Sequence, residues 1–256
     1  MRIKREINIA LSALLFFTRL KFPFKVAYRP EHQGYLLTWF PAIGYVVGGI
    51  GAAVFYLAQL VFPQAVAVVL ALVAMLLLTG AIHEDGLADV CDGFGGGYTP
   101  DRILEIMKDS SLGVYGTLGL ILLFALKISL LASMPVAWVP LALLMSHTLS
   151  RWSVLGLTQT LPYARPEGPS KSRAISQSLS WKRVLLISLV ICLPLCFLPL
   201  VMSAVLGLIL LSTCLFRLWL KNQIGAYTGD CLGAMQQINE LLVQLYILAL
   251  CALGFV

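Results

Sequence analysis

Apolar stretches of about 20 residues, separated by short polar segments, recur along the whole chain. An α-helix needs that length to cross the hydrocarbon core of a bilayer, and an ionised side chain at the bilayer centre is costly. Seven stretches predict membrane-spanning helices: Leu36–Phe62, Gln64–His83, Gly113–Ser133, Val136–Leu161, Val184–Leu200, Met202–Leu220 and Leu241–Val256. The boundary between the fifth and sixth stays open, because Pro194 and Pro199 can either kink or end a membrane helix.

A basic segment, residues 1–35, precedes the first predicted span. Its apolar run from Ile7 to Phe17 is flanked by seven Lys and Arg residues. A signal peptide begins similarly but continues to a cleavage site with small residues, whereas this run ends in Phe-Phe-Thr-Arg. We therefore predict an uncleaved basic helix that lies in the membrane interface. The alternative is that this run also spans the bilayer.

Composition agrees with a membrane protein. Of the 256 residues, 59% are hydrophobic and 12% are charged, whereas a soluble domain has roughly 25% charged residues. The mean hydropathy is +0.90. The sequence thus predicts an all-α fold, a polytopic transmembrane helical bundle of about seven spans plus the N-terminal interfacial helix. A single integral membrane domain, residues 1–256, accounts for the whole chain.

The basic residues predict the topology. Sixteen of the eighteen Lys and Arg lie on one side of the membrane if there are seven spans: fifteen fall in the N-terminal segment 1–35 and in the predicted loops 84–112, 163–183 and 221–240, and Arg217 lies just before the last of these loops. The connections on the other side contain none, so the positive-inside rule makes the basic side cytoplasmic. The net charge of +6 is then a signal of topology and of anionic lipid. No nucleic-acid partner is expected, since no basic stripe with interleaved aromatic residues is present.

The acidic residues are concentrated in one predicted cytoplasmic loop, residues 84–112, which holds seven of the twelve Asp and Glu. Asp85, Asp89 and Asp92 are spaced i, i+4, i+7, so on a helix they would share one face. Carboxylates placed in this way repel one another unless a cation lies among them, and oxygen ligands suit Mg²⁺. The alternative is a solvated helix face at the membrane edge. Gly95 and Gly96 follow, and their amides could hold a phosphate, although a glycine run is a weak signal.

Two further polar motifs fall on the same predicted side. Lys108 can neutralise a phosphate, and the adjacent Asp109 can act as a metal ligand or a base, while Ser110 and Ser111 could equally cap the next helix. Near the other end of the chain, Gly229 and Asp230 form a second candidate turn. Asp230 could face a ligand or could cap the helix that leads into the last span.

Other polar residues leave alternatives open. His83 could orient a carboxylate or phosphate, or could be an interfacial histidine without a role. Arg151 and His147 share one face of a predicted span, and we favour Arg151 as a site residue because ionisable groups within the membrane are usually functional. Lys127 could snorkel or pair within the bundle. The six cysteines include no CxxC pair, which favours buried thiols over disulfides or a zinc site.

These motifs resemble those of the cobalamin synthase family, the adenosylcobinamide-GDP ribazoletransferases. The resemblance extends over nearly the whole chain and rests on His83–Gly93, Met107–Gly113, Thr228–Ala234, Phe40-Pro41-x-x-Gly44, Arg151 and Tyr163–Gly168. Glu84 extends the acidic cluster at a position where variation is expected, and no core carboxylate is missing.

The resemblance implies a transfer in which the ribose 3′-hydroxyl of α-ribazole, or of its 5′-phosphate, attacks the cobinamide-side phosphorus of adenosylcobinamide-GDP and GMP leaves. Carboxylate-held metal ions can stabilise charge in such a reaction. The roles expected are Asp85, Asp89 and Asp92 as Mg²⁺ ligands, Asp109 and Asp230 as ligand or base, and Lys108, His83, Arg151, Arg165, Gly95, Gly96 and Gly229 as groups that bind phosphate or substrate.

The expected location is the bacterial or archaeal cytoplasmic (inner) membrane, with the active site facing the cytoplasm. The expected partners are the corrinoid and ribazole substrates and the lipid bilayer, with homo-oligomers or other cobalamin-assembly enzymes left open. Two other classes stand as alternatives. A membrane phosphotransferase of the CDP-alcohol type needs Asp-Gly-x-x-Ala-Arg, but Asp89 follows Ala88 here. A transporter would place its carboxylates near the bilayer midplane.

Overall fold

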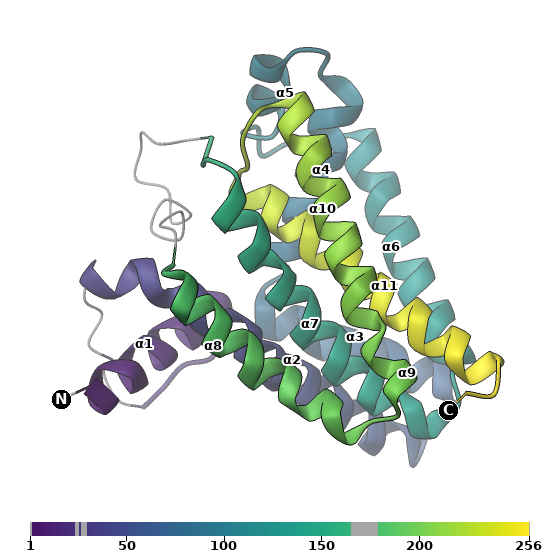
Figure 1. Ribbon diagram of the computed structural model, residues 1–256. Helices are drawn as coiled ribbons and strands as arrows, with labels where there is room; N and C mark the ends of the chain where they lie inside the picture. Colours follow the sequence, from purple (N-terminus) through teal and green to yellow (C-terminus); the bar gives the residue numbers. More distant parts are fainter. Residues whose placement is uncertain (1, 24–25, 27–29, 165–178, 256) are drawn as a thin grey trace.

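The computed structural model describes residues 2–23, 26, 30–164 and 179–255, which form a bundle of helices (Figure 1). The α-helices are α1 (Arg2–Phe17), α2 (Leu36–Gln59), α3 (Gln64–Thr79), α4 (Ile82–Gly96), α5 (Pro100–Ile106), α6 (Val114–Ser133), α7 (Val139–Thr160), α8 (Trp181–Cys192), α9 (Leu200–Ser203), α10 (Val205–Gln223) and α11 (Gly229–Ala252). Short 3₁₀ turns occupy Pro30–Tyr35, Val136–Trp138 and Leu193–Phe197. The predicted all-helical fold is confirmed for the described residues.

The centre of the bundle is the crossing of α2 with α7. Gly44 and Gly48 lie one turn apart on α2, and a β-carbon at Gly48 would lie 2.6 Å from the carbonyl oxygen of Leu143. A β-carbon at Gly44 would overlap the backbone of His147. Small residues at this spacing let two helix backbones approach closely, which is a common packing mode in membranes. The contact fixes α7, which also packs against α11, at the core of the molecule.

The chain turns sharply between α3 and α4. Gly80 and Ala81 both have left-handed backbone conformations, with φ angles of 69° and 58°. The Gly80 amide closes α3 by donating to the carbonyl of Leu76 at 2.8 Å. The axis of α4 then departs by 89° from that of α3. This turn directs the acidic motif across the end of α11 instead of continuing along α3.

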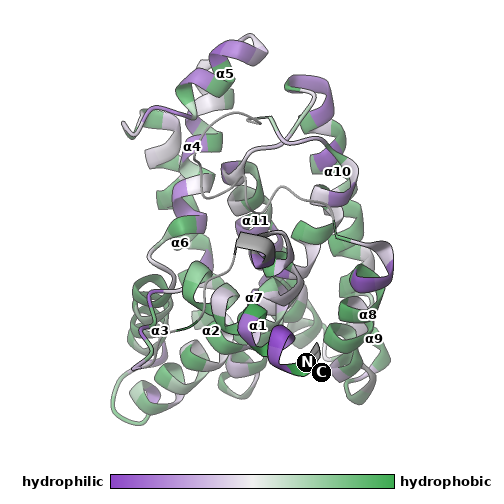
Figure 2. Cartoon of the chain, turned by 90° about the vertical axis from the view of Figure 1, so that its left-hand side faces the viewer, coloured by the Kyte–Doolittle hydropathy of each residue, from purple (hydrophilic) through white to green (hydrophobic). Residues whose placement is uncertain are grey.

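Among the described residues, three helical stretches are long and apolar enough to cross a membrane: Leu36–Gln59, Val114–Ser133 and Leu200–Gln223. The bent pair α3 and α4 makes a fourth if it counts as one span. Hydrophilic residues gather at the end of the bundle that carries α5 and also occur on α1, whereas α2, α3 and α9 are mainly hydrophobic (Figure 2). These features indicate a membrane protein, while the seven predicted spans and the interfacial position of α1 are not confirmed.

The local structure differs from the prediction in two places. The acidic segment 84–112, expected to be a loop, is largely helical, because α4 and α5 occupy most of it. The Thr228–Ala234 motif also lies mainly on a helix, because α11 begins at Gly229 and continues without interruption to Ala252. The predicted loop 221–240 and the last predicted span therefore largely share one helix. The predicted site residue Arg165 lies outside the described residues.

Candidate active site

The first motif, His83–Gly93, and the third motif, Thr228–Ala234, meet where α4 crosses the start of α11. A β-carbon at Gly86 would lie 2.9 Å from the carbonyl oxygen of Asp230 and 3.0 Å from its Cα. On the opposite helix, a β-carbon at Gly233 would lie 3.0 Å from the carbonyl oxygen of His83. Only residues without side chains allow two backbones to approach this closely. The two glycines therefore bring the carboxylate-bearing segments of both motifs together.

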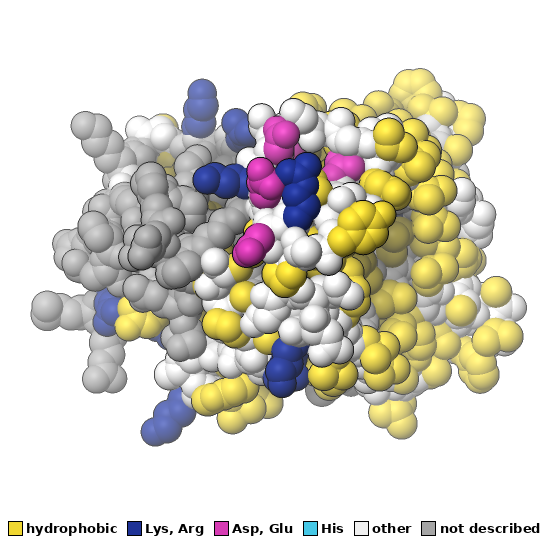
Figure 3. Space-filling model, turned by 90° about the horizontal axis from the view of Figure 1, so that it is seen from above, with side chains coloured by type: hydrophobic (Ala, Val, Ile, Leu, Met, Phe, Trp, Pro, Cys, Tyr) yellow, Lys and Arg dark blue, Asp and Glu magenta, His cyan; other side chains and the backbone are white. Residues whose placement is uncertain are grey.

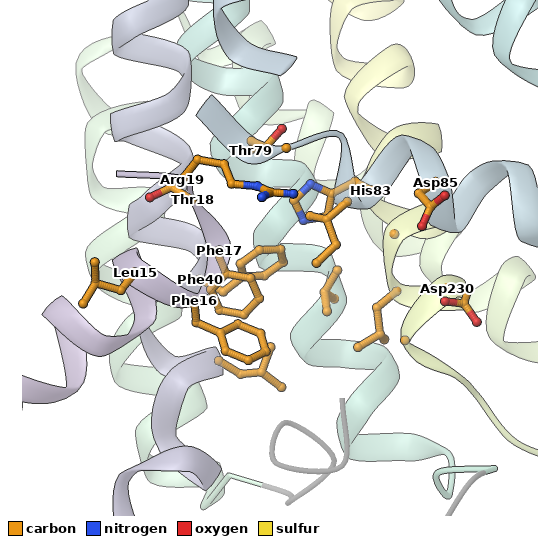
Figure 4. A pocket seen from close by; sticks show the side chains of 17 residues that line it. Leu15, Phe16, Phe17, Thr18, Arg19, Phe40, Thr79, His83, Asp85 and Asp230 are labelled. Carbon is orange, nitrogen blue, oxygen red and sulfur yellow. The ribbon is translucent and has the colours of Figure 1, made fainter. Parts of the chain in front are cut away.

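A cavity of about 630 Å³ opens beside this crossing, and we call it the Asp85 pocket. Its polar end contains Asp85 and Asp230, with His83 between α3 and α11 (Figure 4). Its other wall is aromatic, since the rings of Phe17 and Phe40 lie 4.3 Å apart and the Phe40 ring lies 5.6 Å from that of His83. A pocket with a carboxylate end and an aromatic wall suits a ligand that is polar at one end and planar at the other.

Asp230 is held at the first turn of α11. Thr228 is the N-cap, because its Oγ1 accepts a hydrogen bond from the amide of Cys231 at 3.3 Å. The same hydroxyl lies 3.1 Å from Oδ2 of Asp230, to which it can donate. The cap role considered for Asp230 thus belongs to Thr228. A carboxylate at this position is stabilised by the positive end of the helix dipole.

A short parallel bridge supports this turn. The Tyr227 amide donates to the carbonyl of Pro162 at 2.9 Å, and the Ala164 amide donates to the carbonyl of Tyr227 at 2.8 Å. The segment that follows α7 is therefore fastened directly beside the third motif. The Tyr163–Gly168 motif begins at this bridge.

Asp92 lies further along α4 and binds the start of α6. Its Oδ2 accepts the amide hydrogen of Gly113 at 2.8 Å, and its Oδ1 accepts that of Gly116 at 2.9 Å. The first amides of a helix have no partner within that helix, so this carboxylate caps α6 from a distance of 21 residues in the sequence. β-Carbons at Gly113 and Gly116 would overlap its oxygens. Asp92 thereby positions the second motif, Met107–Gly113.

The second motif lines a separate open groove of about 690 Å³, which we call the Asp109 groove. Lys108, Asp109, Gly96 and one edge of Asp92 contribute to it. Asp109 Oδ1 accepts the amide hydrogen of Ser111 at 3.0 Å, and hydrogen bonds from Ser111 hold the pKa of Asp109 below its usual value. Acidic and basic side chains lie together on this end of the molecule (Figure 3).

A buried ionic cluster lies between α6, α7 and α11. Nζ of Lys127 is 2.5 Å from Oε1 of Glu240, and Nδ1 of His147 is 3.3 Å from Oε2 of the same carboxylate. Arg151 Nη1 donates to the carbonyl of His147 at 2.9 Å. All four side chains are buried. Burial of charges is costly unless they are paired, and here Lys127 and His147 both lie beside the carboxylate of Glu240, while Arg151 contacts His147.

Amide side chains connect this cluster to α4. Gln237 Nε2 donates to Oε1 of Glu84 at 3.0 Å, and Lys127 Nζ donates to Oε1 of Gln237 at 2.7 Å. A cavity of about 10 Å³, enough for one water molecule, lies among Glu84, Lys127, His147 and Glu240. Successive residues of α4 therefore face different environments, with Glu84 toward the ionic cluster and Asp85 toward the pocket.

Comparison with known proteins identifies the family of this chain. The family described as cobalamin-5-phosphate synthase matches residues 9–249. The chain belongs to this family.

Curated relatives of the family cover almost all of the chain. A protein of Shewanella amazonensis named adenosylcobinamide-GDP ribazoletransferase is 45% identical over 253 residues, which cover 96% of this chain and 97% of the relative. Proteins of the same name from Vibrio cholerae and Ralstonia pickettii are 38% and 39% identical. They cover 96% and 91% of this chain and 95% and 91% of their own lengths. No solved structure gives a significant match.

The family motifs are distributed over three environments in the described residues. The Asp85 pocket brings together His83, Asp85, Gly229 and Asp230. The Asp109 groove contains Asp92, Gly96, Lys108 and Asp109. Gly95 packs against the Tyr115 ring, since a β-carbon there would lie 2.5 Å from Cγ of that ring. Arg151 is in the buried ionic cluster, and Asp89 is half-buried on α4, between Asp85 and Asp92 in the sequence.

Sequence reasoning missed two contributors to the pocket and the buried ionic cluster. The first is the end of α1, which supplies Phe17 and Arg19 to the Asp85 pocket although this segment was predicted to lie on the membrane surface. The second is Glu240, the partner of Lys127. The sequence did contain a signal for Glu240, because this glutamate directly precedes an apolar stretch. If one continuous helix carries both into the membrane, the buried carboxylate needs a cation as a partner.

Proposed function

We propose that this chain is an adenosylcobinamide-GDP ribazoletransferase that catalyses the final step of cobalamin assembly. Family membership over residues 9–249 and the names of the relatives support this activity. The structural observation that carries it is the meeting of Asp85 and Asp230 in one pocket, although 145 residues separate them in the sequence. A single pocket is what a transfer between two substrates requires.

In the proposed reaction, the ribose 3′-hydroxyl oxygen of ribazole forms a bond to the cobinamide-side phosphorus of adenosylcobinamide-GDP. The bond from that phosphorus to the bridging oxygen breaks, and GMP leaves with the bridging oxygen. We assign the hydroxyl proton to Asp230, whose carboxylate is held by Thr228 at the start of α11. A base must lie within hydrogen-bond reach of the proton it removes, and a residue in the pocket wall meets that condition.

Mg²⁺ is the cofactor that the chemistry of these residues suits. No three His, Cys, Asp or Glu side chains of the described part of the chain form a cluster able to hold a metal ion. Mg²⁺ in phosphoryl-transfer enzymes commonly takes only one or two carboxylates and completes its coordination with water and substrate phosphate. Asp85 fits that pattern, with Asp89 one turn further along α4, while Asp230 keeps the role of proton acceptor. The ion would supply charge stabilisation for the transferring phosphorus.

Asp92 has a different role in this proposal. Both of its oxygens accept amide hydrogens from the start of α6, which leaves the carboxylate poorly placed as a metal ligand. We assign it the positioning of the second motif, so that Lys108 and Asp109 face the groove. His83 lines the pocket itself, whereas Arg151 lies behind its aromatic wall, with its guanidinium 5.5 Å from the centre of the Phe40 ring.

We further propose that the protein lies in the cytoplasmic membrane with α5 and the pocket on the cytoplasmic side. The seven-span topology follows if α3, α7, α8 and α11 cross the bilayer together with α2, α6 and the α9–α10 stretch, while α1 lies in the interface. In support, α7 and α11 contain 22 and 24 residues. Their polar residues His147, Arg151 and Glu240 are buried within the bundle and do not face lipid.

The activity is tested with purified protein in liposomes, supplied with synthetic adenosylcobinamide-GDP and α-ribazole. We expect GMP and the corrinoid product to appear in equal amounts, and both to disappear when EDTA removes divalent cations. Release of GMP without a corrinoid product would indicate a hydrolase. No release with Mg²⁺ present would exclude the proposed function.

A further inference from the structure

The end of α1 is fastened to the rim of the Asp85 pocket. The helix ends at Phe17, and the next residue, Thr18, donates from Oγ1 to the carbonyl of Leu14 at 2.6 Å. The Arg19 amide then donates to the carbonyl of Leu78 at 2.7 Å, at the end of α3. These backbone and side-chain bonds give Arg19 a defined place above the pocket.

The guanidinium group of Arg19 lies against the backbone of Gly80. A β-carbon at Gly80 would overlap Nε of Arg19 and would lie 3.0 Å from its Cζ and Nη2. The side chain therefore occupies the space that any other residue at position 80 would fill. It extends from the α1 side between Thr79 and His83, toward the end of the pocket where Asp85 lies (Figure 4).

Arg19 carries a positive charge without an ion-pair partner among the described residues, and its side chain is exposed to the pocket. Asp85 lines the same cavity, but no salt bridge joins it to Arg19 in the described part of the chain. The N-terminus of α11, at Gly229, contributes the positive end of a helix dipole to the same wall. Two positive features thus face a pocket that also holds carboxylates.

We propose that Arg19 binds a phosphate group of the substrate in the Asp85 pocket. This inference rests on the proposed function. A guanidinium group presents a planar fork of donors that matches two phosphate oxygens, and its stem is already ordered against Gly80. The phosphate has two possible sources, the diphosphate of adenosylcobinamide-GDP and the 5′-phosphate of α-ribazole 5′-phosphate. Arg19 thereby makes α1 a wall of the active site and a determinant of substrate specificity.

The test is Arg19→Gln, a neutral side chain of similar reach. Loss of one charge-assisted contact is expected to raise the KM of the substrate that carries the phosphate by a factor on the order of 10 to 100. The two sources are distinguished by varying α-ribazole or α-ribazole 5′-phosphate at fixed adenosylcobinamide-GDP, and then by varying adenosylcobinamide-GDP with each acceptor in turn. A KM increase confined to the phosphorylated ribazole assigns Arg19 to the 5′-phosphate, and an increase for adenosylcobinamide-GDP with either acceptor assigns it to the diphosphate.

A binding measurement gives a readout that does not depend on turnover. Each ligand is titrated in the presence of EDTA. If Arg19 binds the diphosphate, Arg19→Gln should bind GMP more weakly than the wild type and guanosine equally well. If Arg19 binds the 5′-phosphate of the ribazole, the variant should bind α-ribazole 5′-phosphate more weakly and α-ribazole equally well. Lys4→Gln removes one exposed positive charge from the same helix outside the pocket and should leave all these constants unchanged.

Wild-type KM and binding constants in Arg19→Gln, in a protein that is active, would overturn the inference while leaving the proposed function intact. Equal losses in Lys4→Gln would also overturn it, by showing a general charge effect. An inactive wild type would instead overturn the proposed function.

Discussion

Gly86 of α4 packs directly on the backbone of Asp230 of α11, so that a β-carbon at position 86 would lie 2.9 Å from the Asp230 carbonyl oxygen. This contact sets the separation of the two carboxylates that line the Asp85 pocket. A small change at Gly86 must therefore move Asp230 relative to Asp85. Such a displacement disturbs catalytic geometry more than it disturbs folding.

We expect Gly86→Ala to lower kcat by a factor on the order of 10 to 100, because the added methyl group forces α4 and α11 apart. The matched control is Gly207→Ala on α10, where an added β-carbon would meet nothing within 4 Å. The control should retain wild-type turnover and an equal or higher Tm, since alanine favours a helix. Wild-type kcat in Gly86→Ala would show that the crossing does not set the site.

Asp85→Asn and Asp230→Asn should each lower kcat by a factor on the order of 10² or more while the protein still inserts and purifies. Each change keeps the shape of the side chain but removes its negative charge. The control is Asp101→Asn, an exposed position on α5 that lines neither the pocket nor the groove. If Asp230→Asn keeps wild-type turnover with a slightly lower Tm, Asp230 is a structural residue only.

Asp92→Asn should act chiefly on stability. Replacement of the carboxylate weakens its bonds to the amides of Gly113 and Gly116, at a cost of about 1–3 kcal/mol in the free energy of unfolding. Thermal unfolding in detergent measures this effect, and added Mg²⁺ should not restore the lost Tm. A variant with unchanged Tm whose activity recovers at high Mg²⁺ would return Asp92 to the metal site.

Lys127→Met should destabilise the protein by about 3–5 kcal/mol, since it leaves Glu240 buried without its closest cation. The double variant Lys127→Met, Glu240→Gln removes both charges and should recover much of that loss. Thermal unfolding of the two single variants and the double variant measures the coupling free energy. Additive losses would mean that the 2.5 Å contact contributes little.

The proposed topology predicts that positions 98 and 222 face the same compartment. Tyr98 is 96% exposed between α4 and α5, and Asn222 is exposed at the end of α10. Single cysteines at these positions, in a protein without the six native cysteines, should both react only with reagents that reach the cytoplasmic side. Labelling from opposite sides would be incompatible with seven spans.

The all-helical fold and the family could be predicted from the sequence, because hydrophobic periodicity and local motifs are properties of short segments. The sequence was not sufficient for the division of the motifs among the pocket, the groove and the ionic cluster. Asp85 and Asp92 are two turns apart on one helix face, yet one lines a pocket and the other caps α6. That difference depends on which helix packs at each turn of α4, and the sequence spacing contains no information about those partners.

The participation of α1 was hidden for a related reason. A basic segment with an apolar run has the same pattern whether it lies on lipid or covers a pocket, so the pattern alone could not place Arg19. The decisive features are the left-handed turn at Gly80 and the bond between Arg19 and Leu78, which arise only when α1 and α3 are packed.

The pairing of Lys127 with Glu240 also constrains how the chain is made. The two residues are separated by 113 positions, so at ordinary rates of synthesis Lys127 exists for on the order of ten seconds before Glu240 leaves the ribosome. If α6 crosses the bilayer as proposed, it must hold an uncompensated ammonium group during that interval, at a cost of about 3 kcal/mol. Its other nineteen residues carry no charge, which allows the helix to stay in the bilayer until its counter-ion arrives.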